Sequence, residues 1–195
     1  MHQVKEFKLE GKLKGISDSQ IQQHRDVLYK GYVDKLNLIE KELETASTEG
    51  ANGTYSPYRE LKKEEPFTAN AIALHELYFG NLGGPGGPAT GKAADLIDAR
   101  YGSFDKFKTM FKAAGMSARG WVVLCWNFND DSLHSYTMDM HDIGGVFGCA
   151  PLLVLDVYEH AYMVDYGVKR APYLDAFFEN INWDAVNKRA AHVPV

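Results

Sequence analysis

A run of glycine and proline near the middle of the chain most constrains how this sequence can fold. The segment Gly83-Gly84-Pro85-Gly86-Gly87-Pro88 fits neither a helix interior nor a central β-strand, because proline lacks an amide hydrogen and glycine has no side chain to pack. We expect it to divide the 195 residues into an N-terminal domain, residues 1–87, and a C-terminal domain, residues 88–195.

Before this boundary the apolar residues recur at helical spacing. Ser17 and Gln20 form a capping-box pattern that opens one long helix. Its inward positions follow every three or four residues: Ile21, His24, Leu28, Tyr32, Leu36, Ile39 and Leu43. The polar residues 49–58 turn the chain, and a second helix over about 68–82 carries His75 on its apolar face. The first domain is therefore expected to be a helical hairpin.

After the boundary, helical periodicity alternates with strand-like runs. The pattern predicts strands at 121–126, 133–138 and 152–156, with a hairpin turn at 127–131 between the first two. Helices are expected at 93–100, 104–114, 172–178 and 183–191. The fold class is thus α+β, with a three-stranded antiparallel sheet flanked by helices in the C-terminal domain.

Charge and composition exclude several classes of partner. The formal net charge is -5, and acidic and basic residues are interleaved, which argues against nucleic acid or an anionic membrane as partner. No run approaches the roughly 20 apolar residues of a membrane span, and the N-terminus lacks the apolar segment of a signal peptide. We expect a cytoplasmic protein. Cys125 and Cys149 lie in apolar contexts typical of buried thiols, without a CxxC partner or a nearby base.

The end of the third expected strand carries the residues most suggestive of chemistry. Asp156 and His160 lie four residues apart, directly after the apolar run 151–155, where an unpaired charge is costly. A metal ion is the simplest partner, and His24 and His75 are the other buried-looking candidates. Three neutral imidazoles and one carboxylate suit iron or manganese. Taken singly, however, each histidine is as well explained as a core residue, and Asp156 as a helix cap.

Several short motifs together resemble the iron/manganese superoxide dismutase family over essentially the full chain. The run Asp-Val-Tyr-Glu-His-Ala-Tyr at 156–162 is similar to the family signature, in which a tryptophan occupies the place of Tyr158. The other matching motifs are Gln23-His24, Tyr32-Val33, Leu36-Asn37, Leu74-His75-Glu76-Leu77-Tyr78-Phe79, Asn81-Leu82-Gly83-Gly84, Gly120-Trp121 and Asn182-Trp183.

The resemblance implies an enzyme that disproportionates superoxide to dioxygen and hydrogen peroxide by alternating M(III)/M(II) redox. It implies that His24, His75, Asp156 and His160 hold one iron or manganese ion per subunit, with solvent as a fifth ligand. Iron is slightly favoured, and no further cofactor is expected.

The resemblance also assigns residues around the metal. Tyr32 corresponds to the tyrosine of the substrate channel, and Trp121 to the tryptophan beside the site. A glutamine that usually donates to the bound solvent is absent, because its two possible places hold Ala71 and His141. We expect one nitrogen of His141 to donate a hydrogen bond to the metal-bound solvent and the other to form a hydrogen bond with Tyr32. The alternatives are that Tyr32 only packs and that His141 lies on the surface.

Subunit contacts form the last set of expectations. In the family, the counterpart of Glu159 bonds the ligand histidine of the other subunit, so we expect a homodimer or tetramer with Glu159 and His160 at the interface. Leu28 and Met163 stand where the family usually has a histidine and a tyrosine that bond across the interface, which predicts altered proton delivery through Tyr32.

Two other functions remain open at the level of sequence. One is a metal-binding or structural protein on the same fold with little dismutase activity, since a fold does not guarantee an activity. The other is a mononuclear iron oxygenase, whose site has two histidines and one carboxylate. The third histidine counts against it.

Overall fold

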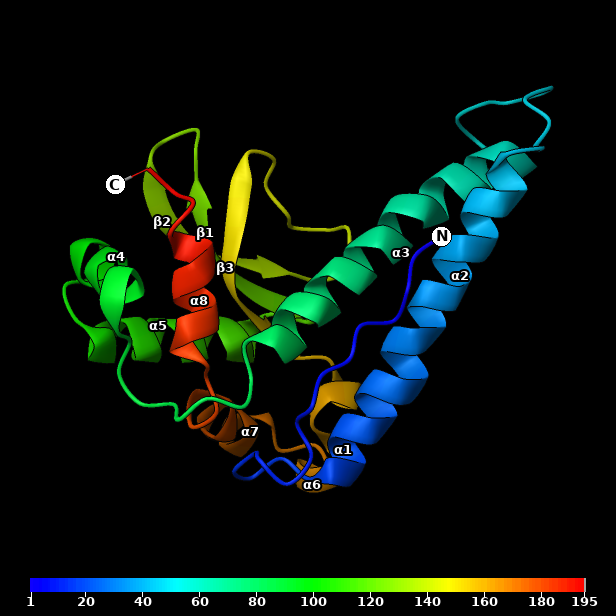
Figure 1. Cartoon of the computed structure of the whole chain (residues 1–195). Helices are drawn as coiled ribbons and strands as arrows, with labels where there is room; N and C mark the ends of the chain where they lie inside the picture. Colours follow the sequence, from blue (N-terminus) through cyan, green and yellow to red (C-terminus); the bar gives the residue numbers. More distant parts are fainter. Residues whose placement is uncertain (195) are drawn as a thin grey trace.

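The computed structural model describes residues 1–194. An extended N-terminal segment lies along a long helical hairpin, and a three-stranded sheet with further helices stands beside the base of that hairpin (Figure 1). The segment is held there by hydrogen bonds such as the one from the Lys5 amide to Tyr29 Oη, 3.0 Å. No helix among the described residues is long and apolar enough to cross a membrane.

The first arm of the hairpin is one continuous helix with an irregular middle. It comprises α1 (Asp18–Gln22), a π-helical segment η1 (Gln23–Tyr29) and α2 (Lys30–Leu43). Ser17 caps its start by accepting a hydrogen bond from the Gln20 amide, as the capping box predicts.

The π-helical segment changes which residues face the core. A π turn holds an extra residue, so the inward positions continue from His24 to Tyr29 and Val33. Leu28 and Tyr32, predicted to be inward, are only partly buried. The expected inward positions are therefore wrong at Leu28 and Tyr32, whereas Leu36 is buried as predicted.

The second arm, α3 (Pro57–Gly80), begins well before the expected residue 68. Residues 57–67 are largely charged and include Pro66 inside the helix, a combination that disfavours a helix by pattern. The helix starts there because Ser56 accepts a hydrogen bond from the Arg59 amide and Pro57 occupies the first helical position.

The C-terminal half contains the predicted sheet. Strands β1 (Trp121–Asn127), β2 (Ser132–Met138) and β3 (Cys149–Asp156) are arranged in the order β2-β1-β3, with both pairs antiparallel. Every residue of the central strand β1 is buried. The expected α+β class is thereby confirmed.

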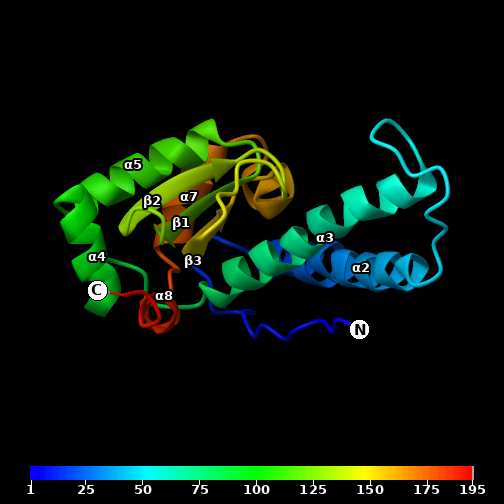
Figure 2. The same ribbon diagram turned by 90° about the horizontal axis from the view of Figure 1, so that it is seen from above.

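Helices surround this sheet, and α5 runs along one face of it (Figure 2). They are α4 (Gly91–Tyr101), α5 (Phe104–Ser117), a 3₁₀ turn η2 (Glu159–Ala161), α6 (Met163–Tyr166), α7 (Arg170–Phe178) and α8 (Trp183–Ala190). The short elements η2 and α6 follow directly after β3 and were not expected from periodicity.

The glycine-proline run connects the two halves by close backbone packing. A Cβ atom at Gly84 would lie 2.4 Å from the Asn182 Cα, so this position accepts no side chain. The amides of Gly84 and Gly86 donate to the carbonyls of Asn180 and Ile181. These contacts fix the end of α3, and hence His75, relative to the C-terminal half.

Candidate metal centre

Four predicted residues meet where the hairpin joins the sheet. His24 comes from η1, His75 from α3, Asp156 from the last position of β3 and His160 from η2. One candidate ligand atom from each lies within 4.8 Å of all the others. The side chains of His24, His75 and Asp156 are fully buried, and that of His160 is 26% exposed.

A single carboxylate oxygen is the centre of this cluster. Asp156 Oδ2 lies 3.1 Å from His24 Nε2, 3.2 Å from His160 Nε2 and 3.7 Å from His75 Nε2. The other oxygen, Oδ1, accepts from the Tyr158 amide at 2.9 Å, which fixes the carboxylate plane. The convergence of three imidazoles on one buried carboxylate is the arrangement of a metal site.

The hydrogen-bonding state of the histidines tests whether a metal fits. His75 Nδ1 must carry its proton, because it donates to the Ala71 carbonyl at 2.6 Å, so Nε2 presents a lone pair to the centre. Among the described residues, neither His75 Nε2 nor either ring nitrogen of His24 has a hydrogen-bond partner. Buried polar atoms left without partners are destabilising, whereas a metal ion would use the converging lone pairs.

At His24, His75 and Asp156 the electrostatics favour the protonation states that bind metal, whereas the Asp156 carboxylate raises the pKa of His160 against the effect of burial. Burial, with the neighbouring His24, lowers the pKa of His75 to about 3, and burial also lowers the pKa of His24. For Asp156, burial alone would raise the pKa, but His160 and His24 outweigh it and hold the pKa below its usual range. Near neutral pH the site therefore contains neutral imidazoles on His24 and His75 and an ionised carboxylate.

A hydrogen-bonded chain of three residues lies beside the cluster. Trp121 Nε1 donates to His141 Nδ1 at 3.0 Å, and His141 Nε2 lies 3.0 Å from Tyr32 Oη. Since an indole can only donate, Nδ1 must accept, and the proton of neutral His141 must be on Nε2. His141 thus donates to Tyr32, and the Tyr32 hydroxyl hydrogen remains available for another acceptor.

This chain corrects one expectation and excludes an alternative. The second nitrogen of His141, assigned from sequence to bound solvent, accepts from Trp121 instead. His141 is 2% exposed, so it is not the surface residue that the alternative supposed. Burial lowers its pKa to about 4, which keeps the ring neutral.

Aromatic rings complete the walls of the site. Trp121 meets His75 edge-on at 4.9 Å between centroids, and Tyr158 stacks on His160 at 5.1 Å. Phe67 packs against His141 at 4.7 Å. Sequence reasoning missed Phe67, although its spacing of eight residues before His75 places both on one helix face.

Sequence reasoning also missed a contact to the backbone of Asp156. The Tyr173 hydroxyl in α7 donates to the Asp156 carbonyl at 2.7 Å and lies 3.0 Å from the Tyr78 hydroxyl. No local pattern indicates this pairing, because it depends on how α7 packs against β3.

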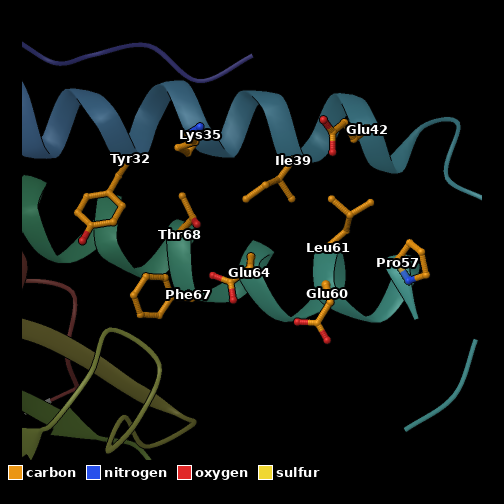
Figure 3. A pocket seen from close by; sticks show the side chains of 10 residues that line it. All are labelled: Tyr32, Lys35, Ile39, Glu42, Pro57, Glu60, Leu61, Glu64, Phe67 and Thr68. Carbon is orange, nitrogen blue, oxygen red and sulfur yellow. The ribbon is translucent and has the colours of Figure 1, made fainter. Parts of the chain in front are cut away.

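A pocket of about 510 Å³ between α2 and α3 touches the site only at its Tyr32 and Phe67 end (Figure 3). Its charged lining residues are Lys35, Glu42, Glu60 and Glu64. Three carboxylates and one ammonium favour cations over anions, so this pocket is poorly suited to attract an anionic substrate.

These features define a class: a mononuclear metalloprotein with three histidines and one aspartate between a helical hairpin and a small sheet. A sequence model of the C-terminal domain of iron/manganese superoxide dismutases matches residues 89–189. The chain belongs to the iron/manganese superoxide dismutase family.

Individual relatives cover most of the chain. An iron superoxide dismutase of Aquifex pyrophilus is 46% identical over 182 residues, which are 91% of this chain and 85% of the relative. An iron superoxide dismutase of Cupriavidus metallidurans is 36% identical, with 92% and 91% covered. A manganese superoxide dismutase of Halobacterium salinarum is 34% identical, with 89% and 86% covered.

Proposed function

We propose that this protein is a superoxide dismutase, an oxidoreductase that converts two superoxide ions and two protons into dioxygen and hydrogen peroxide. The observation that carries the proposal is the buried cluster of three imidazoles and one carboxylate with unpartnered ring nitrogens, in a chain of this family.

We assign His24, His75, Asp156 and His160 as the residues that hold iron or manganese. The ion, when bound, supplies one-electron chemistry through its M(III)/M(II) couple. The Asp156 carboxylate partly neutralises its charge in a water-poor site, and the Ala71 carbonyl and the Tyr158 amide orient His75 and Asp156. Iron is slightly favoured, which is supported by the two relatives at 46% identity, both named as iron enzymes.

Tyr32, His141 and Trp121 are proposed to manage protons at the site. The indole of Trp121 holds His141 in the Nε2–H tautomer, and His141 donates a hydrogen bond to the Tyr32 oxygen. Burial and the nearby Asp156 charge raise the pKa of Tyr32, so the phenol keeps its hydrogen at neutral pH. It can therefore donate to an oxygen species that develops negative charge beside the cluster.

The proposed assembly is a homodimer or tetramer with Glu159 and His160 at the interface. Exposed apolar side chains near these residues support it, since Val27, Met163 and Val164 are 64%, 47% and 49% exposed. Leu28 and Met163 would then make an apolar contact in place of the family's hydrogen bond, so that protons reach Tyr32 by another route.

We further propose a division into domains at residues 87 and 88, and a cytoplasmic location. The match of the C-terminal domain sequence model to residues 89–189 supports the division. The unbroken mixture of charges along the chain is compatible with the location.

The test is metal analysis of protein produced with iron or with manganese, followed by a superoxide-consumption assay of each form. His75→Ala should lose both metal and activity, whereas His134→Ala, a surface histidine paired with Asp130, should keep both. Full metal content without activity in either form would favour the alternative, a metal-binding protein without dismutase function.

A further inference from the structure

The two cysteines lie together on the sheet, away from the metal centre. Cys125 in β1 pairs with Pro151 in β3, and Cys149 stands two residues before Pro151, opposite Asn127. Residues two apart on a strand point to the same face, so the two thiols are diagonal neighbours on adjacent strands. The Cys149 thiol is near enough to raise the pKa of the Cys125 thiol, and both are free thiols in this structure.

Both thiols line one pocket of about 300 Å³ between this face of the sheet and α3. Leu74 and Leu77 of α3 form part of its wall, and Val146 and Phe147 come from the loop that joins β2 to β3. Phe147 is 98% exposed, so its ring does not close the pocket. A small uncharged molecule can therefore approach the thiols from this side.

The two thiols differ in accessibility. Cys149 is partly exposed, whereas Cys125 is only 2% exposed. Burial raises the pKa of the Cys125 thiol, and the neighbouring Cys149 thiol raises it further. Reaction with an oxidant should accordingly begin at Cys149, with Cys125 as the second thiol.

We propose that Cys149 and Cys125 are a peroxide-sensitive thiol pair that closes to an intrachain disulfide across β1 and β3. The proposal concerns a site separate from the metal centre and draws on the proposed function only for its oxidant, since hydrogen peroxide is the product of superoxide dismutation.

The chemistry proceeds in two balanced steps. The Cys149 sulfur attacks one peroxide oxygen, the O–O bond breaks, and Cys149 becomes a sulfenic acid with release of water. The Cys125 sulfur then attacks the Cys149 sulfur, the S–O bond breaks, and a second water leaves as the disulfide forms. The thiols lose two electrons in total, and one hydrogen peroxide accepts them.

In the test, reduced, metal-loaded protein is treated with hydrogen peroxide and then unfolded in denaturant that contains N-ethylmaleimide. Mass spectrometry counts the thiols that have been alkylated. We expect loss of both alkylation sites, a peptide containing Cys125 linked to Cys149 within one chain, and recovery of both sites with dithiothreitol. Catalase added before the peroxide should prevent the change. Because peroxide is supplied directly, this result is independent of dismutase activity, which is assayed separately.

Variants separate the roles of the two thiols. Cys125→Ala should leave a Cys149 sulfenic acid that dimedone traps, and Cys149→Ser should leave Cys125 fully alkylatable. Circular dichroism checks that each variant is folded, with Cys125→Ser as a second form if alanine disturbs the core. Two alkylatable thiols after peroxide treatment, overoxidation of Cys149 without a disulfide, or a disulfide between subunits would each overturn the proposal.

Discussion

At the scale of single residues, Tyr32 shows how neighbours determine what a side chain can do. Its oxygen accepts from His141, whose own proton position is dictated by Trp121. The hydroxyl hydrogen is thereby directed away from His141. The phenol is a proton donor because Trp121 fixes the proton of His141 on Nε2, and His141 donates that proton to the Tyr32 oxygen.

Replacing Tyr32 by phenylalanine should separate proton delivery from metal binding. We expect Tyr32→Phe to retain its metal, because the four ligands are unchanged, and to turn over more slowly by about 100-fold, the lower end of the range for lost acid catalysis. The measurement is superoxide turnover per bound metal at saturating substrate. The control is Tyr101→Phe, whose hydroxyl bonds Ser135 far from the cluster. Unchanged turnover in Tyr32→Phe would remove Tyr32 from the mechanism.

At the scale of elements, the π-helical segment decides which side of the first helix carries the ligand. Sequence periodicity identified the helix, its cap and the inward position of His24, because each has a local signal. It did not identify the extra residue in the turn after His24, which is visible only when Tyr29 is seen buried and Leu28 is not. Tertiary packing, rather than propensity, selects that turn.

Deleting one exposed residue inside η1 tests this interpretation. Removing Val27 would place Tyr29 four positions after His24, which is the same face of an ordinary α-helix, so we expect a folded protein that keeps its metal. Removing the exposed Asp34 from α2 should instead rotate Leu36 away from the core and lower soluble yield and thermal stability. Equal damage from both deletions would contradict the role assigned to the π turn.

The remaining elements divide in the same way between local signals and long-range packing. The first two strands were predictable because strand-like runs flank a clear turn, the third because it is a short apolar run, and the four cluster residues because their motifs match a family. The early start of α3 and the short elements after β3 were not, since a charged segment with Pro66 has no apolar stripe. His141 and Trp121 were both assigned to the site, but the hydrogen bond between them was not predicted, because it joins β1 to a loop.

At the scale of the whole molecule, the metal centre joins segments that are distant in sequence. Its ligands come from η1, α3, β3 and η2, so a bound ion links the helical hairpin to the sheet. Binding to the folded state alone should stabilise that state.

Removal of the metal should therefore lower the midpoint temperature of thermal unfolding. For an ion at about 1,000 times its dissociation constant, the stabilisation is about 4 kcal/mol, or roughly 10 °C for a chain of this size. Differential scanning calorimetry before and after chelation measures the shift. Readdition of iron or manganese should restore the original midpoint. An unfolding midpoint that is the same with and without metal would contradict a structural link through the ion.

Assembly is tested at the same scale through Glu159. Because this carboxylate is proposed to bond His160 of the other subunit, Glu159→Ala should weaken association by at least about tenfold, the effect of roughly 1.4 kcal/mol. Sedimentation equilibrium gives the association constant. Glu44→Ala, an exposed carboxylate at the end of α2, is the matched control. Identical association of both variants would place the interface elsewhere.

The central claim is that the cluster of His24, His75, Asp156 and His160 holds the ion that dismutates superoxide. The most direct measurement is the rate of superoxide decay, by stopped flow, in protein loaded with increasing fractions of iron or manganese. The account predicts that the catalytic rate rises in proportion to bound metal up to one ion per chain and stays at background in His75→Ala. A fully loaded protein in which superoxide decays only at the background rate, with either metal, would contradict it.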